Sequence, residues 1–299
     1  KFIVNPIAGE GKAKSLLPKL KSNLNKSAVD YEIYITKGRL DAVEAAQSAV
    51  KDGFDIVVAV GGDGTVNEIL NGLVGSDAIL AAVHGGKGND FATAVNMPRD
   101  IDAACADLLT AKVKKIDLGR VMDRYFINSV GIGFDATVAN RVNRGIKPLK
   151  GVSAYIYAVF ETLFTYKPVE MEITMDDEVF KLKPMLVAVG IGPAYGGGMR
   201  IVPNAIQDDG LFDICIFDQM SRLKLAYHFP KVFKGKHTNL AQAIMYRVPD
   251  IQVRSSEPLP LHMEGEILFG DQMDFTLKKH GMKVLTGSVS NKGRTNERF

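Results

Sequence analysis

The run Gly61-Gly62-Asp63-Gly64-Thr65 contains the residue types of this chain that best suit phosphate chemistry. Its three glycines let backbone N–H groups approach a bound group closely. Asp63 stands among them, where a lone carboxylate would repel a phosphate, so we expect a divalent cation to bridge the two. The pattern therefore predicts a phosphate-binding turn with a carboxylate placed for Mg²⁺. The alternative is a tight turn with an incidental Asp.

The residues on either side of this run predict the elements that position it. Residues 56–60 are apolar without alternation, which is typical of a buried parallel strand. Thr65 and Glu68 fit a capping box at the start of a helix. The segment is thus interpreted as strand, glycine turn and helix, and a helix N-terminus favours anions.

The first 122 residues alternate between strand and helix patterns. Strands are expected at 2–4, 31–35, 56–60 and 80–83, with helices such as 13–24 and 41–51. This alternation predicts a doubly wound α/β domain with a parallel sheet over residues 1–122. Ligands bind such sheets at the carboxyl ends of the strands, where this chain places polar or glycine-rich loops.

From residue 123 to 286 the pattern changes to short alternating runs, which predict an antiparallel second domain, a sandwich or open barrel. Residues 175–178 read as a hairpin turn, and helices are expected at 152–165 and 221–233. The sequence leaves open whether residues 287–299 return to the first domain. The polar end of the chain is expected to fray. The expected strands are 125–130, 169–174, 179–183, 186–191, 211–217, 251–254, 273–277 and 283–285.

Composition excludes several classes of protein. The chain has 37 basic and 34 acidic residues among 299, a formal charge of +3, so it has no bulk signature of nucleic-acid binding. Cys105 and Cys215 stand among apolar neighbours, which indicates buried free thiols and a reducing, cytoplasmic setting. Neither an 18-residue apolar run nor a signal-peptide pattern is present in the sequence.

Other polar residues have both a functional and a structural interpretation. Asn89 and Asp90 follow a second glycine loop and could also be plain helix caps. Asp117 alone is more typical of a turn, and Asp209-Gly210 of a hairpin. Glu264 and Glu266 flank Gly265; in a strand they would share one face, and the alternative is a solvated turn.

The order of these motifs resembles the diacylglycerol kinase catalytic family, which includes bacterial lipid kinases and the sphingosine and ceramide kinases. The resemblance covers nearly the whole chain. It implies ATP-dependent phosphate transfer to a lipid hydroxyl, an N-terminal domain like that of NAD kinase, a C-terminal β-sandwich, and an active site between them. The motifs that carry it are Asn5-Pro6 with Gly9 and Gly11, residues 61–68, residues 88–92, residues 116–119, residues 196–198 with Pro203, Asp209-Gly210 and Gly265-Glu266.

The resemblance also implies roles for individual residues. Glu266 matches the family's proton acceptor, with Glu264 and Asp63 as further catalytic candidates. Asp63, Asp90, Asp117 and Asp209 match aspartates that organise Mg²⁺, and a structural Mg²⁺ would bind Asp209 and the carbonyl groups of Ile206 and Leu211. The implied ATP contacts are Asn5, Gly9, Gly11, Thr36, Gly61, Gly62, Asp63, Gly64, Thr65, Asn67, Glu68, Lys87 and Asn89.

The chain departs from the family pattern at three positions. His84 replaces a proline and Lys87 a threonine; a lysine there either contacts a phosphate or blocks the usual geometry. Glu264 replaces an aspartate, and one added methylene moves its carboxylate by about 1 Å. These changes bear on rate and substrate, and they leave the nucleotide motif intact.

A lipid kinase must reach a membrane surface, so we expect peripheral membrane association. The aromatic-rich helix at 152–165 either lies in the membrane interface or, as we favour, belongs to the core. Lys224, Lys231, Lys234, Lys236 and His237 form either a patch for anionic lipid or ordinary solvated surface. An NAD kinase-type enzyme and a catalytically weak nucleotide-binding regulator are the alternative functions. The sequence leaves open whether the protein is a homodimer, and it does not identify the lipid that is phosphorylated.

Overall fold

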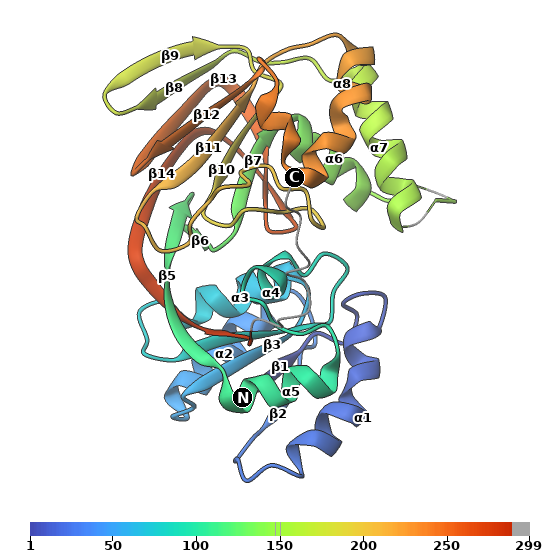
Figure 1. Ribbon diagram of the computed structural model, residues 1–299, viewed down its shortest axis with the longest axis vertical. Coiled ribbons are helices and arrows are strands. Elements are labelled where there is room, and N and C mark those ends of the chain that lie inside the picture. The colour runs from blue at the N-terminus through green and yellow to red at the C-terminus, as the bar shows by residue number, and fades with distance from the viewer. Residues whose placement is uncertain (147, 150, 289–299) are drawn as a thin grey trace, which may run out of the picture. The chain divides into compact units, whose positions relative to one another are not determined.

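The computed structural model describes residues 1–146, 148–149 and 151–288 of the chain. Lys147, Lys150 and the polar tail beyond Ser288 lie outside the described residues. The chain divides into two compact units (Figure 1). The first comprises Lys1–Lys115 and the segment that begins at Lys283, and the second comprises Ile116–Met282.

The first unit alternates strands and helices from its first residues onward. Apolar β-branched runs form the strands, and β3 is buried from its second residue to its last. The elements are β1 (Phe2–Val4), α1 (Lys12–Leu24), β2 (Ile33–Ile35), α2 (Asp41–Lys51), β3 (Ile56–Gly61), α3 (Asp63–Leu73), β4 (Ile79–His84), α4 (Asp90–Ala94) and α5 (Ile101–Thr110).

The strand order of this unit creates a natural ligand-binding position. β1 pairs in parallel with β2 on one side and with β3 on the other, and β3 pairs in parallel with β4. The chain runs from β1 to β2 in one direction across the sheet, and from β2 to β3 and β4 in the other. Because crossovers are right-handed, this reversal places α1 on one face and α2 and α3 on the other. The reversal lies between β1 and β3, and open α/β sheets bind ligands beside the carboxyl ends of such strands.

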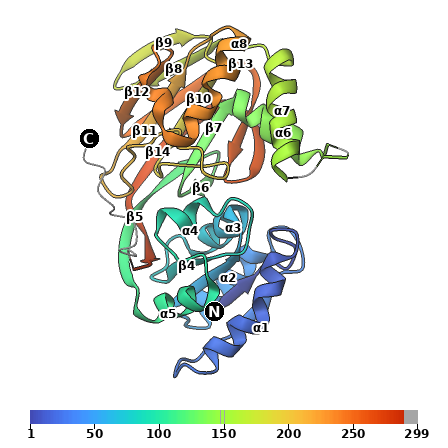
Figure 2. The same cartoon turned by 45° about the vertical axis from the view of Figure 1, so that its right-hand side comes forward.

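The second unit is an antiparallel assembly with helices at one side (Figure 2). Strands β12, β11, β10 and β7 pair in that order, and β13 joins β7 to β8 and β9. The elements are β6 (Arg124–Phe126), β7 (Ser129–Gly133), α6 (Phe134–Asn143), α7 (Gly151–Thr165), β8 (Met171–Met175), β9 (Glu178–Leu182), β10 (Leu186–Gly190), β11 (Phe212–Phe217), α8 (Arg222–His228), the 3₁₀ helices η1 (Phe229–Lys234) and η2 (Lys236–Asn239), β12 (Ala243–Val248) and β13 (Asp250–Met263).

Inward-facing apolar side chains of these strands form the core of the second unit. Phe126, Phe212 and Phe275 meet there, with the rings of Phe126 and Phe212 stacked 5.9 Å apart. Around them lie alternate residues such as Val187, Val189 and others from β7, β11 and β13. Two long strands connect the units along the chain: β5 (Lys112–Val121) and β14 (Glu266–Thr286) each begin in one unit and end in the other.

The predicted fold class, an α/β domain followed by an antiparallel β-sandwich, is confirmed. The predicted hairpin at 175–178 is also confirmed, because Met175 pairs with Glu178 and both turn residues have positive φ. Several boundaries were wrong. Residues 125–130 are divided between two strands, β6 and β7, with Ile127 and Asn128 between them. The segments 273–277 and 283–285 belong to the single strand β14, and α6 was not predicted.

Candidate functional site

Three loops of the first unit pack backbone against backbone after β1, β3 and β4. A side-chain carbon built on Gly9 would lie 2.6 Å from the carbonyl oxygen of Gly85, and one on Gly85 would lie 2.8 Å from the amide nitrogen of Gly61. The Gly85 N–H also donates to the Gly61 carbonyl at 3.0 Å. Only glycine allows such contacts, so the sequence builds a glycine-lined surface at the switch point of the sheet.

Asp63 is the first residue of α3 and links two of these loops. Its Oδ1 accepts a hydrogen bond from the N–H of Phe91, at the start of α4, at 3.0 Å. Burial raises the pKa of Asp63 above its usual range, and the backbone N–H groups around it, Phe91 foremost, counteract part of that rise. The carboxylate is therefore held in place at the glycine surface.

The capping box predicted for Thr65 and Glu68 is wrong, because α3 begins at Asp63, directly after Gly62. Both side chains have other partners. The Thr65 Oγ1 accepts a hydrogen bond from the Asn5 amide at 3.1 Å, and the Glu68 carboxylate accepts one from the Leu40 N–H at 3.1 Å. These bonds connect α3 to the loops that follow β1 and β2.

The other first-unit residues implied by the resemblance lie on the same loops. Thr36 is buried at the end of β2, where its N–H donates to the Val4 carbonyl at 2.9 Å. Gly11 occupies the N-cap position of α1 with φ 91°. Asn67 is buried on α3. The predicted nucleotide residues of this unit therefore share one edge of the sheet.

The end of β4 and the loop after it contain both departures of the first unit from the family pattern. His84 is buried, its Nε2 lies 2.8 Å from the Met97 carbonyl oxygen, and burial lowers its pKa. Lys87 forms an exposed ion pair with Glu10 at 2.8 Å. Asn89 occupies the N-cap position of α4, but its side chain bonds both backbone groups of Gly86, at 2.7 and 2.9 Å. Its role is to close this loop.

In the second unit, Asp117 fixes the loop that precedes β11. It is fully buried in β5, so its expected turn position was wrong. Its two carboxylate oxygens accept hydrogen bonds from the N–H groups of Gly210 and His280, each at 2.7 Å. Asp209 accepts a hydrogen bond from the Leu211 N–H at 3.0 Å and pairs with Arg247. Arg247 thus places a positive charge at the predicted structural metal position.

Glu264 and Glu266 belong to the hairpin between β13 and β14. Met263 pairs with Glu266, so Glu264 and Gly265 are the two turn residues, with φ 46° and 98°. The prediction that both carboxylates share a strand face was wrong, and so was the solvated-turn alternative for Glu264. Glu264 is buried and accepts the N–H groups of Ile127 and Asn128, each at 2.6 Å.

Glu266 has a different environment. It is partly exposed and pairs with Arg124, whose side chain is also partly exposed. His262 supports the same hairpin, because its Nε2 accepts the Gly265 N–H at 3.1 Å, and burial lowers its pKa to about 4. The hairpin therefore presents Glu266 at its surface and keeps Glu264 inside.

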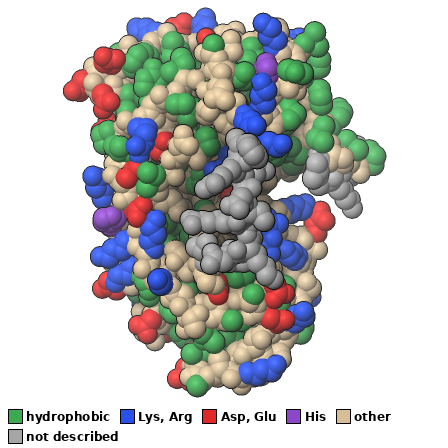
Figure 3. Space-filling view, viewed as in Figure 1, with side chains coloured by type: hydrophobic (Ala, Val, Ile, Leu, Met, Phe, Trp, Pro, Cys, Tyr) green, Lys and Arg blue, Asp and Glu red, His purple; other side chains and the backbone are tan. Residues whose placement is uncertain are grey.

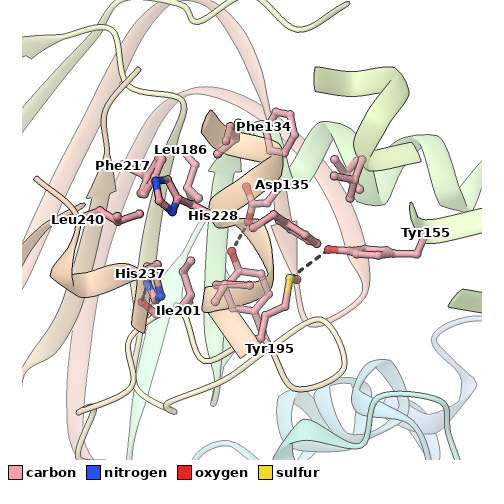
Figure 4. Close-up of a pocket in the computed structure, with 16 residues that line it drawn as sticks. Phe134, Asp135, Tyr155, Leu186, Tyr195, Ile201, Phe217, His228, His237 and Leu240 are labelled. Carbon is pink, nitrogen blue, oxygen red and sulfur yellow. Dashed lines mark hydrogen bonds between the residues drawn. The ribbon is translucent and has the colours of Figure 1, made fainter. Parts of the chain in front are cut away.

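The second unit also contains an apolar pocket, which the sequence analysis missed (Figure 4). Its interior is about 70 Å³, and it lies among α6, α7, α8, η1 and the strands β10 and β11. The glycine turn at 196–198 brings Tyr195 and Met199 to it, because their backbones pair across the turn. The apolar lining residues are Phe134, Val138, Val159, Leu186, Met199, Ile201, Phe217, Leu225, Phe229, Val232 and Leu240.

Polar groups stand inside this apolar lining. Tyr195 donates its hydroxyl hydrogen to the carboxylate of Asp135, as Figure 4 shows, and burial raises the pKa of Asp135 to about 6. The Nε2 of His237 lies 2.9 Å from the carbonyl oxygen of Ile201, so Nε2 carries the hydrogen. The buried Nδ1 is then an acceptor without a partner among the described residues. Gly131 is the signal that could have pointed to Asp135, because any side chain at position 131 would collide with the Asp135 carboxylate.

The described residues include no group of three or more His, Cys, Asp or Glu side chains placed to hold a metal ion. Asp63 and Asp90 lie in the first unit, whereas Asp117 and Asp209 lie in the second. The convergence of the four aspartates stays a prediction, as do the assigned roles of the site residues. Cys105 and Cys215 are free and buried.

Comparison with known proteins shows which family models, relatives and solved structures this chain is similar to. Residues 1–121 match the model of the diacylglycerol kinase catalytic domain, and residues 128–285 match that of the YegS C-terminal NAD kinase beta sandwich-like domain. A diacylglycerol kinase of Staphylococcus saprophyticus is 30% identical over 94% of this chain and 93% of its own. A diacylglycerol kinase of Staphylococcus epidermidis strain RP62A is 30% identical over 89% and 85%. A solved diacylglycerol kinase of Bacillus anthracis shares 25% identity, with a TM-score of 0.74 over 96% of both chains.

Proposed function

Because this chain belongs to the diacylglycerol kinase catalytic family, we propose that it transfers the γ-phosphate of ATP to the hydroxyl group of diacylglycerol, forming phosphatidic acid. The observation that carries the proposal is that relatives named for this activity align through both units. The residues of each unit offer what such a transfer requires, which is positioning and charge neutralisation more than covalent chemistry.

The glycine surface of the first unit would bind the nucleotide. Its backbone approaches a bound group without side chains in the way, and the eleven-residue helix α3 starts there. Asn5, bonded to Thr65, and Glu68, bonded to the loop before α2, fix the loops that surround it. Lys87 would add a positive charge at the phosphates by leaving Glu10 and pairing with a phosphate instead. The ion pair between Lys87 and Glu10 is exposed, so it is easily exchanged.

The donor set fits Mg²⁺ in the first unit. Asp63 and Asp90 offer the hard carboxylate oxygens that Mg²⁺ prefers, at the starts of α3 and α4. When bound, Mg²⁺ would neutralise the negative charge of the phosphate oxygens. In the second unit, the carbonyl groups of Ile206 and Leu211 with Asp209 would suit a structural ion only in competition with Arg247. Asp117 would position that loop.

Glu266 would accept the proton of the attacking hydroxyl group. Of the two hairpin carboxylates it is the accessible one, because the Glu264 carboxylate is buried and accepts two backbone N–H groups. A positioned proton acceptor must lie within hydrogen-bond reach of the hydroxyl group it serves. Glu264 would hold the hairpin that carries Glu266.

The apolar pocket of the second unit would hold part of a lipid chain. Apolar side chains dominate its lining, and the few polar groups in it, Asp135, Tyr195 and His237, would fix a ligand's orientation. No helix among the described residues is long and apolar enough to cross a bilayer. We also propose that the protein meets its lipid substrate at the membrane surface, on the cytoplasmic side.

A side-by-side acceptor panel tests the proposed function. Purified protein is incubated with ATP and MgCl₂ and with micelles of diacylglycerol, a sphingoid base or a polyprenol, or with NAD. We expect phosphatidic acid to form fastest. NADP formation without a lipid product would contradict the proposal in favour of an NAD kinase. ATP binding without any product would contradict it in favour of a nucleotide-binding regulator.

A further inference from the structure

The outer side of α7 exposes large apolar side chains. Ile156, Phe160 and Phe164 recur every fourth residue and therefore lie on one face, with Tyr157 beside them. These side chains are 47%, 49%, 58% and 45% exposed, in the order Ile156, Phe160, Phe164 and Tyr157. The opposite side of the helix packs into the unit through residues such as Ala158 and Leu163. A helix with large apolar side chains on two opposite sides is normally covered on both of them.

The neighbouring helix α8 extends this exposed surface. Leu223 and Tyr227 stand one turn apart and are 82% and 76% exposed. The Arg222 guanidinium lies 5.5 Å from the centroid of the Phe164 ring, so the two exposed faces adjoin. We call Ile156, Tyr157, Phe160, Phe164, Leu223 and Tyr227 the α7–α8 face. In Figures 1 and 2 the two helices lie side by side at the edge of the second unit.

The charged side chains beside this face are mostly basic, and the carboxylate on α7, Glu161, is paired with Arg141. The segment from Arg222 to Lys236 contains five basic residues and no Asp or Glu. Figure 3 shows Lys and Arg side chains next to the apolar ones at this end of the unit. An apolar surface bordered by basic residues matches an anionic bilayer, where aromatic side chains enter the interface and cations meet the headgroups.

We propose that the α7–α8 face is the surface through which this protein docks on an anionic membrane. The proposal rests on the proposed lipid kinase function and says where that function meets its substrate. The charges disfavour a second copy as the occupant, because a twofold contact through this face would bring two such basic segments together.

The same helices line the apolar pocket from within. Tyr155 and Val159 of α7 and Leu225 and His228 of α8 face the pocket, while the neighbouring residues on each helix form the docking face. One helix pair thus separates the proposed membrane contact from the proposed chain site. A lipid chain that leaves the bilayer under this face would have a short path into the pocket.

The absence of tryptophan from the sequence allows a direct test. A Phe164→Trp variant contains a single indole on the face, and Val179→Trp places one at a similarly exposed site on β9. Each variant is mixed with vesicles of phosphatidylcholine alone or with phosphatidylglycerol, with and without brominated acyl chains. We expect the indole at 164 to shift its emission to shorter wavelength and to be quenched by brominated chains in anionic vesicles, and the indole at 179 to do neither.

Charge variants test the same proposal independently. Lys224→Ala and Lys231→Ala should each weaken partition into anionic vesicles about fivefold. Quenching that is absent at 164, or equal at 164 and 179, would overturn the proposal. So would a stable dimer in sedimentation that Leu223→Asp dissociates, because the face would then join two copies.

The outcome for the docking face is separable from that of the proposed function. Kinase activity on detergent micelles with no vesicle binding at 164 would overturn the docking face and leave the lipid kinase standing. Vesicle binding at 164 without turnover of any lipid would support the docking face and overturn the proposed lipid kinase function.

Discussion

Two glutamates two residues apart have different environments because their partners differ. Glu264 is buried against two backbone N–H groups, whereas Glu266 shares a partly exposed ion pair with Arg124. A carboxylate that already accepts two backbone hydrogen bonds in the interior is committed to the fold. The Glu266 carboxylate, two positions later, is partly exposed, and it is the one that we propose as the proton acceptor.

The two glutamates should separate in a mutational test. Glu264→Gln should lower the unfolding free energy by about 1–3 kcal/mol, because a neutral amide oxygen accepts the two buried N–H groups more weakly than the charged Oε1 that both of them share. Glu266→Gln should lower kcat by about 10²–10⁴-fold with little change in stability. Urea denaturation and steady-state kinetics measure both. Full turnover in Glu266→Gln would remove it from the proton-acceptor role.

Asp135 should make stability depend on pH. Burial raises its folded-state pKa to about 6, so the folded protein binds a proton that the unfolded chain, with a pKa near 4, releases. Its contribution to the unfolding free energy therefore falls as pH rises from about 4 to about 6 and stays low above. Asp135→Asn should flatten this part of the profile, measured by urea denaturation. The exposed Asp177→Asn variant is the control; equal slopes in all three proteins would contradict the assignment.

At the scale of elements, the glycine loops after β1, β3 and β4 depend on backbone contact. Gly85→Ala should cost about 1–3 kcal/mol and weaken ATP binding, because its new methyl group would lie 2.8 Å from the Gly61 nitrogen. Gly38→Ala is the matched control, since nothing lies within 4 Å of its added carbon. Thermal denaturation and calorimetric titration with ATP check both. Equal ATP affinity in the two variants would argue against the glycine surface as the nucleotide site.

The inner side of α7 gives a second prediction at this scale. Val159→Trp would fill part of the apolar pocket, and excluding two methylene groups of a lipid chain corresponds to about tenfold in affinity. We expect kcat/KM to fall for long-chain diacylglycerol and to hold for a short-chain analogue. The exposed Phe160→Trp variant is the control in micelles. An unchanged ratio of long-chain to short-chain activity in Val159→Trp would mean that the lipid chain binds outside this pocket.

Across the whole molecule, sequence reasoning succeeded where the determining contacts are local. The limits of β1 and α2 were predicted without error, because an apolar run and a 3.6-residue period are local patterns. Asp117 and Glu264 were misplaced because their partners are distant in sequence: Gly210 and His280 lie 93 and 163 residues from Asp117, and Ile127 lies 137 residues from Glu264. The apolar pocket was missed for the same reason, since its walls come from several elements that are far apart in the sequence.

The proposed function of the whole molecule requires a carboxylate at the glycine surface together with a lipid acceptor. The most direct test is the rate of phosphatidic acid formation from ATP and diacylglycerol micelles in wild type, Asp63→Ala and Asp55→Ala. Asp55 is an exposed aspartate before the opposite end of β3, so it controls for loss of one carboxylate. We predict product from wild type and Asp55→Ala and none from Asp63→Ala. Equal rates in all three proteins, or no phosphatidic acid from wild type, would contradict the account.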